Sequence, residues 1–194
     1  MSINATSNYM SDASIIAWMQ DKTEGLYGQM RTAMEGANER ADAESALVDI
    51  KAAITNSKDD ATKTEAVHGL IEAALAKYGD VPEVAEVLQP LLTELNKRYE
   101  EYARDAATPT VYAGPDGEMT QIWSDPAPVT IKSNDVDAWT KQVGDKVDAL
   151  GKRDQLDMIN IQEFNSEINQ AKQTASALLD SADKSTNTII NHIA

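Results

Sequence analysis

Histidine and carboxylate side chains are the residues of this 194-residue sequence whose types and spacing could support chemistry. Glu65 and His68 form a Glu-x-x-His pair, which on a helix is the spacing that di-iron carboxylate bundles use. Such a site needs a second pair and two further glutamates, and His192, the other histidine, has no glutamate three residues before it. We therefore predict no metal site and no cofactor, and we interpret His68 as a surface or helix-end histidine.

Asp154 and Asp157 form a second candidate site. Both fall on the seam predicted for the C-terminal helix, which is the row of mostly apolar residues that faces a partner helix. Carboxylates three residues apart could serve acid/base chemistry or bind a cation. The alternative, which Gly151, Lys152 and Arg153 favour, is that the partner helix diverges here and leaves both carboxylates in water. The sequence has no Gly-rich phosphate loop and no Gly-x-Ser-x-Gly motif. We expect that the protein is not an enzyme.

Composition narrows the classes of partner. The net charge of −15 argues against nucleic acid or an anionic membrane surface, because both select basic patches. Cysteine is absent, which excludes disulfides and thiol chemistry. No apolar run approaches the roughly 20 residues of a membrane span. With a single phenylalanine, aliphatic side chains must do most of the packing, which favours thin helical bundles.

The segment from Asn134 to the C-terminus predicts one very long helix. Asn134 can cap it, and neither proline nor a glycine after Gly151 interrupts it. Apolar residues recur at the 3-4 spacing of a coiled coil, so this helix needs a partner along much of its length. The seam residues that we expect to carry most of the packing are Ile161, Phe164, Ile168 and Leu178.

A second long helix is predicted to begin near Asp12 or Ser14 and to pair with the C-terminal helix in antiparallel orientation. Its seam begins with Ile16 and continues through Leu26 and Met30. Arg40 and Glu44 interrupt the apolar pattern, so we expect a stutter or a short break near 36–45.

The middle of the chain predicts an αα-hairpin followed by a small β element. One helix runs from Ala61 to Tyr78 and is closed by Gly79, and a second restarts with Asp80 as its cap and Pro82 in its first turn. Short strands are expected at 110–113 and 118–123, with a third possible at 129–131. Trp139 is expected to fasten the last helix to this sheet.

These elements together predict a mainly α fold, an α+β arrangement in which the sheet is minor. We expect a flexible leader at 1–12, a coiled-coil pair formed by 13–55 and 133–194, and an insertion at 56–132 that holds the helical hairpin and the β element. The leader lacks the basic and apolar segments of a cleavable signal peptide. Near the C-terminus, Ile189, Ile190 and Ile193 place apolar side chains on and off the seam. Such a tail could dock on another subunit or cover the chain's own first helix.

This order of parts resembles the tip and filament proteins of bacterial type III secretion injectisomes, the IpaD-, LcrV- and EspA-like group. The similarity is densest from Val129 to Ala194, where a short β stretch and an acidic turn lead through Ala138 and Trp139 into an unbroken helix with a C-terminus rich in Ser, Thr and Asp. The long N-terminal hairpin of the IpaD-like members is missing.

The resemblance implies a structural, secreted protein at the tip of the secretion needle on the bacterial surface. It implies a homo-oligomer that binds the needle subunit through Ile189, Ile190 and Ile193, with Asp154 and Asp157 at an assembly joint. Translocator proteins would be further partners. Two alternatives remain open: a cytosolic helical adaptor or chaperone-like scaffold, and a helical small-molecule or metal-binding enzyme. The enzyme would have its site around Glu65, His68, Tyr78, Tyr99 and Tyr102.

Overall fold

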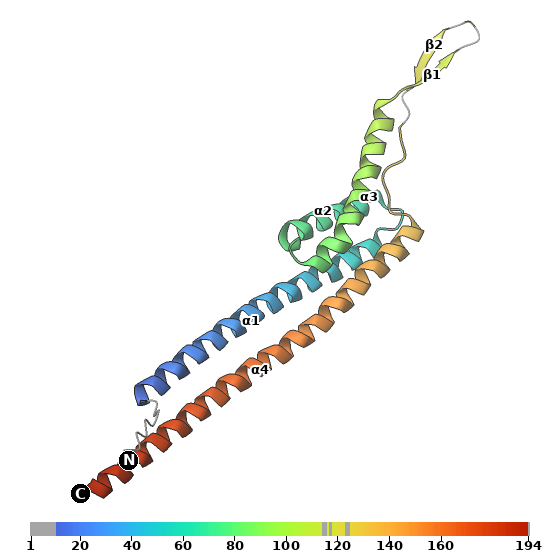
Figure 1. Cartoon of the computed structure of the whole chain (residues 1–194). Helices are drawn as coiled ribbons and strands as arrows, with labels where there is room; N and C mark the ends of the chain where they lie inside the picture. The colour runs from blue at the N-terminus through green and yellow to red at the C-terminus, as the bar shows by residue number, and fades with distance from the viewer. Residues whose placement is uncertain (1–10, 114–115, 117, 123–124, 194) are drawn as a thin grey trace, which may run out of the picture. The chain divides into compact units, whose positions relative to one another are not determined.

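The protein is mainly helical, as predicted, with a minor two-stranded sheet. The computed structural model describes residues 11–113, 116, 118–122 and 125–193, without the side chains of 110, 112, 113 and 185–193. The elements in chain order are α1 (Asp12–Asn56), α2 (Ala61–Tyr78), α3 (Pro82–Ala107), β1 (Thr110–Ala113), β2 (Met119–Ile122) and α4 (Ser133–Ile193), as Figure 1 shows.

The chain folds into two compact units, and both long helices contribute to each of them. One unit, called here the paired-helix unit, comprises Met1–Ala37 and Gln155–Ala194. The other, called the four-helix unit, comprises Asn38–Asp154. The boundary between the units thus cuts through α1 and α4, whereas the domains predicted from the sequence were drawn at helix ends.

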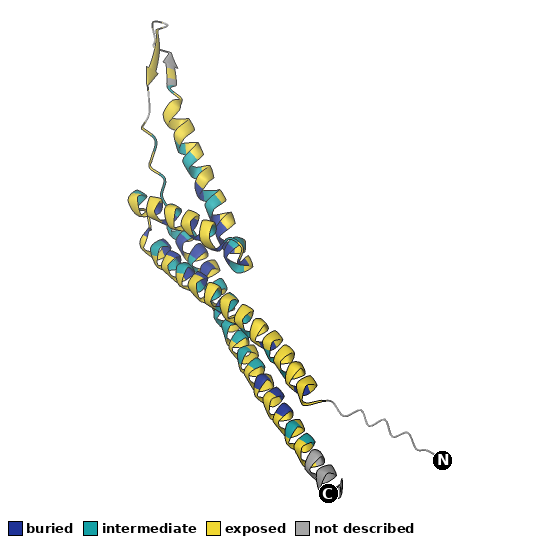
Figure 2. Ribbon diagram, turned by 90° about the vertical axis from the view of Figure 1, so that its left-hand side faces the viewer, coloured by how far each residue is buried: buried dark blue, intermediate teal, exposed yellow. Residues whose placement is uncertain are grey.

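The four-helix unit holds the larger hydrophobic core (Figure 2). Its α2 and α3 pack on each other and on the second half of α1 and the first half of α4. The buried side chains are mostly aliphatic, because the sequence offers few aromatics: Leu47, Ile50 and Ile54 from α1, Val67 and Ile71 from α2, Val84, Leu88 and Leu95 from α3, and Val143 and Leu150 from α4.

A buried polar contact joins the segment before α4 to the start of α2. The hydroxyl of Thr64 accepts a hydrogen bond from the backbone N–H of Ile131 at 3.1 Å and donates one to the carbonyl of Asp60 at 2.8 Å. Both Thr64 and Ile131 are fully buried. Ile131 also forms a parallel bridge with Lys58. The prediction of a third strand at 129–131 was therefore wrong, because Ile131 pairs with the turn between α1 and α2 and not with the β-hairpin.

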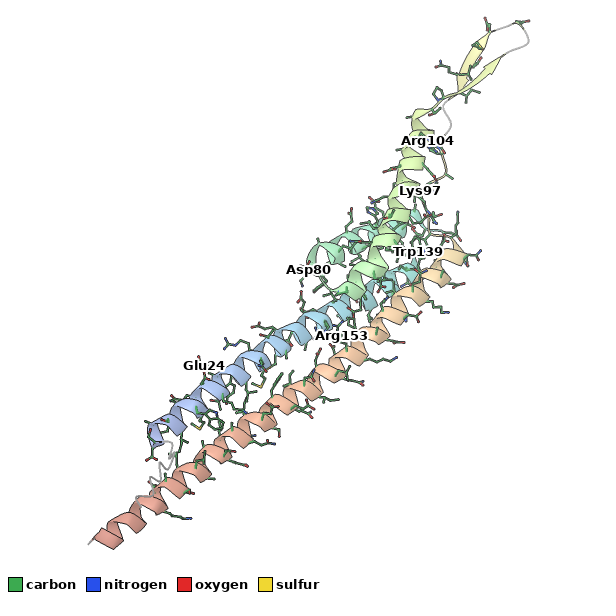
Figure 3. All side chains as sticks on the ribbon, viewed as in Figure 1. Glu24, Asp80, Lys97, Arg104, Trp139 and Arg153 are labelled. Carbon is green, nitrogen blue, oxygen red and sulfur yellow. The ribbon has the colours of Figure 1, made fainter. Side chains whose placement is uncertain are left out.

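Strands β1 and β2 form an antiparallel hairpin in which Thr110 pairs with Ile122 and Ala113 with Met119. The side chains of β2 are all exposed. Trp139, which is labelled in Figure 3, is buried in the core of the four-helix unit. The Cζ of Arg98 lies 5.5 Å from the centroid of the Trp139 ring. The prediction that Trp139 fastens helix to sheet was wrong, because its contacts are with the helical core.

The ends of the helical hairpin follow from local chemistry. The Asp60 carboxylate caps α2 by accepting a hydrogen bond from the N–H of Lys63, which lowers the pKa of Asp60. Gly79 has an ordinary right-handed φ of −63°, but a Cβ there would lie 2.5 Å from the Leu75 carbonyl oxygen, so close backbone approach favours glycine. Asp80 is not the cap of α3. Val81 holds that position and makes no side-chain capping bond.

Helix α1 is continuous from Asp12–Asn56, so the break expected near 36–45 does not occur. The half-buried Arg40 and Glu44 simply extend the seam at a 3-4 spacing. The prediction that the seam begins with Ile16 was wrong by one residue, because Ile15 is buried and Ile16 is exposed.

In the paired-helix unit, α1 and α4 lie side by side and run in opposite directions (Figure 1). The Lys172 ammonium contacts Tyr27 from across the pair, 3.3 Å from its hydroxyl and 5.8 Å from its ring centroid. Leu26 and Ile168 are buried, and Met30, Ile161 and Phe164 are half-buried. Leu178 is 41% exposed, and its neighbour Leu179 is half-buried instead. The seam assignment of Leu178 was therefore wrong, because the spacing after Ala175 is four residues, not three.

Candidate interaction surfaces

A polar layer interrupts the α1–α4 seam at the edge of the four-helix unit. Asp154 is half-buried, and its Oδ1 lies 3.9 Å from Nε of Arg40. Glu44 reaches α4 one turn away, where a Cβ on Gly151 would lie 3.5 Å from its Oε1. The expectation that Asp154 is left in water was wrong, because the partner helix continues and supplies a cation. Asp157 belongs to the paired-helix unit and is half-buried with an interaction of its own.

His68 bridges the two helices of the α2–α3 hairpin. Its Nε2 is 2.6 Å from Oδ1 of Asn96, its Nδ1 is 3.6 Å from the Glu72 carboxylate, and its ring meets the Tyr99 ring edge-on at 5.3 Å. Burial and the nearby Glu65 carboxylate raise the pKa of Tyr99. These contacts hold the imidazole within the hairpin. Among the described residues, no group of three potential metal ligands occurs.

The other tyrosines of the predicted enzyme site have different surroundings. Tyr78 is buried in the core of the four-helix unit, with the Lys77 ammonium 4.7 Å from its ring centroid. Tyr102 lines a hollow of about 400 Å³ between α3 and the segment 126–132, together with Arg98 and Pro126. The structure therefore brings Glu65, His68 and Tyr99 together but gives the other two tyrosines separate roles.

Arg98 is the main electrostatic contact that sequence reasoning missed. Its guanidinium donates to Asp135 at 2.9 Å, to Glu94 at 3.1 Å and to the carbonyl of Thr130 at 3.4 Å. Burial opposes the charge on Arg98, but these two carboxylates outweigh it and raise its pKa. The Glu94–Arg98 spacing of four residues was visible in the sequence. The contact with Asp135, 37 residues away, was not.

Large apolar side chains remain exposed on the paired-helix unit. Leu156, Met158 and Ile159 of α4 are 60%, 55% and 50% exposed. Tyr27 and Met34 of α1 are both 46% exposed. Sequence reasoning missed the α4 group because it followed only the seam, although apolar residues on several sides of one helical turn are a readable signal.

The predicted docking residues Ile189, Ile190 and Ile193 lie within the backbone of α4, but their side chains are outside the described residues. Of the remaining predicted site residues, Leu26 and Ile168 lie in the buried seam, and Met30, Ile161 and Phe164 line it. Asp154 lies in the polar layer with Arg40.

The fold and these surfaces define a mainly helical protein with an antiparallel helix pair, an inserted helical hairpin and exposed apolar side chains. Within the part of the chain that the structure describes, no helix is long and apolar enough to cross a membrane. No protein-family profile, curated protein or solved structure matches the chain.

Proposed function

We propose that the protein is a structural component of a bacterial type III secretion injectisome, a needle-tip or extracellular filament protein. In this role it is secreted to the bacterial surface, assembles on the needle with copies of itself and acts as a platform for translocator proteins. Its partners are the needle subunit, other copies and the translocators. Nucleic acid is not among them, in keeping with the net charge of −15.

The observation that carries the proposal is the thin, incompletely covered helix pair. In the paired-helix unit, the described residues that are buried are Ile15, Leu26, Ile168, Ala171 and Ala175, whereas other large apolar side chains stay exposed. A pair with so small a core gains little from its own packing and benefits from further helices against it. The order of elements, in which the α2–α3 hairpin is inserted between the paired helices α1 and α4, also agrees with the resemblance to injectisome tip and filament proteins.

The resemblance assigns needle or subunit docking to Ile189, Ile190 and Ile193. It assigns an assembly joint to Asp154 and Asp157. Within one chain, the half-buried Arg40–Asp154 contact favours a single register of α1 against α4, because a charged layer in an apolar seam penalises every register that separates the two charges. The role of Asp154 and Asp157 between subunits rests on the resemblance alone.

Deletion of Thr188 to Ala194 tests the docking assignment. We expect the truncated protein to be a helical monomer by circular dichroism and size-exclusion chromatography, and to be absent from needle preparations seen by electron microscopy. A matched variant with serine at 189, 190 and 193 keeps the length and should behave alike, because only the apolar surface is lost. Unchanged assembly by either variant would remove this assignment.

A second candidate, a helical adaptor or chaperone-like scaffold, is favoured by the same exposed apolar side chains and by the exposed hairpin residues Val111, Met119 and Ile122. The two functions differ in where the protein acts. Fractionation of a culture into lysate, medium and sheared surface appendages separates them. Protein confined to the lysate would reject the injectisome function and leave the scaffold.

A further inference from the structure

Helix α4 is apolar on several sides just after it enters the paired-helix unit. Leu156, Met158 and Ile159 are exposed by half or more, and Ile161 is half-buried. At 3.6 residues per turn these four side chains leave the helix in different directions. A single partner helix covers one side only, so a segment of this kind is suited to an assembly of more than two helices.

Two of these residues form a stripe with a carboxylate. Leu156, Ile159 and Glu163 follow i, i+3, i+7 spacing and share one face, called here the α4 stripe. The seam toward α1 is marked by the buried Ile168 and Ala175. At about 100° per residue, the α4 stripe lies roughly 130° around the helix from that seam.

Helix α1 carries a matching stripe in the same unit. Tyr27, Arg31 and Met34 follow i, i+4, i+7 spacing and are all exposed; they are called here the α1 stripe. This stripe lies roughly 90° from the seam marked by Leu26. The contact between Tyr27 and Lys172 holds it on one flank of the pair.

The two stripes are complementary but cannot meet within one chain. Each has two large apolar side chains, and Arg31 on α1 is the counterpart of Glu163 on α4. Because both stripes turn away from the shared seam, their pairing requires two chains. In such a pairing the apolar contact supplies affinity, and the pair of opposite charges supplies the register.

We propose that the α1 stripe of one copy packs on the α4 stripe of the next, with Arg31 beside Glu163. The contact joins two different surfaces and is therefore heterologous, so repeated copies close into a ring or extend into a filament. This inference deepens the self-assembly part of the proposed function and rests on it. Each stripe offers only two large apolar side chains, so pairwise association is weak and becomes effective when several copies are held together.

Cysteine cross-linking tests the contact directly, because the full chain has no cysteine of its own. Met34→Cys and Ile159→Cys variants, one carrying an affinity tag, are mixed in equal amounts and mildly oxidised. We expect mixed disulfide dimers, with neither variant forming comparable dimers alone. Asp180→Cys, at another exposed site of α4, is the matched control partner for Met34→Cys. Equal cross-linking to positions 159 and 180, or no mixed dimer at all, would overturn the proposal.

Charge exchange provides a second test that does not depend on oxidation. We expect Arg31→Glu and Glu163→Arg each to raise the concentration for half-assembly about fivefold in sedimentation velocity at low salt. The double variant should return within about twofold of the original, because the pair is restored with reversed signs. Asp180→Arg controls for the change in net charge. Circular dichroism confirms that each variant keeps its helices. Lack of rescue by the double variant would count against Arg31 and Glu163 as partners.

The outcomes separate this surface from the proposed function. Cross-linking at 34 and 159 in a protein that never reaches the cell surface would keep the contact and reject the injectisome role. Export and needle binding without that cross-link would keep the role and reject the contact.

Discussion

The hydrogen bond from Ile131 to Thr64 gives a prediction whose size can be worked out from the structure. Replacing Thr64 by valine keeps the volume and removes the hydroxyl. The Asp60 carbonyl would not be left without a partner, because it also accepts from the backbone N–H of Thr64 at 2.9 Å. The N–H of Ile131 would lose the hydroxyl that accepts from it at 3.1 Å, in a fully buried position.

An unsatisfied buried N–H costs about 1 to 3 kcal/mol. For a chain of this size, 1 kcal/mol corresponds to roughly 2 to 4 °C in Tm. We therefore expect Thr64→Val to lower the Tm of the protein by roughly 2 to 12 °C. The amide of Ile131 should also exchange its hydrogen faster than its neighbours, because the lost bond is local.

Thermal unfolding followed by circular dichroism measures the first effect, and hydrogen exchange by NMR measures the second. Thr64→Ser is the matched control, because it keeps the hydroxyl and loses only a methyl group, which costs about 1 kcal/mol. If Thr64→Val were as stable as the original protein and its Ile131 amide exchanged equally slowly, the hydrogen bond would not stabilise the contact between the start of α2 and the segment before α4.

Two further predictions concern charge contacts of the four-helix unit. Burial opposes ionisation of Glu83, but a hydrogen bond to its own backbone and the Arg153 guanidinium 2.7 Å away lower its pKa below the usual 4.5. The stabilisation is therefore present above pH 4.5 and is lost as the pH falls through the lowered pKa. The difference in free energy of unfolding by urea between the original protein and Glu83→Gln should therefore shrink from pH 7 to pH 3. A difference that does not change with pH would contradict this. Arg98→Met should destabilise by about 2 kcal/mol, because the Asp135 carboxylate loses its partner, while Arg98→Lys should cost less. In a protein from which the other tryptophans have been removed, the fluorescence emission of Trp139 should shift in both Arg98 variants. An unchanged emission spectrum and an unchanged stability would argue against the contacts of Arg98 with Asp135 and Trp139.

Local sequence patterns were enough to place most helices and the hairpin. Helix α2 and the start of α3 lie where the sequence predicted them, with Gly79 after the first helix and Pro82 at the start of the second. These signals are local, because capping, proline and glycine act within a few residues. The same patterns misplaced Asp80 and the third strand, since both depended on what the neighbouring chain offers.

The candidate surfaces were predicted less well than the fold. Periodicity identified Leu26 and Ile168 as seam residues, but it followed a strict heptad past Ala175 and assigned Leu178 instead of Leu179. It also treated Arg40 as a break in α1. A charged residue on a seam is compatible with an unbroken helix when the facing helix carries an opposite charge at the same level.

The sequence by itself determined that this protein is mainly helical and that its longest helices have an apolar face, because these properties depend on composition and spacing along one chain. The tertiary structure alone decided which distant residues meet: Arg40 with Asp154, Arg98 with Asp135, and Thr64 with Ile131. It also decided which apolar side chains of α4 stay exposed, since that depends on how many helices surround it. Pairings across the chain follow from the register of the packed helices, and no single stretch of sequence encodes that register.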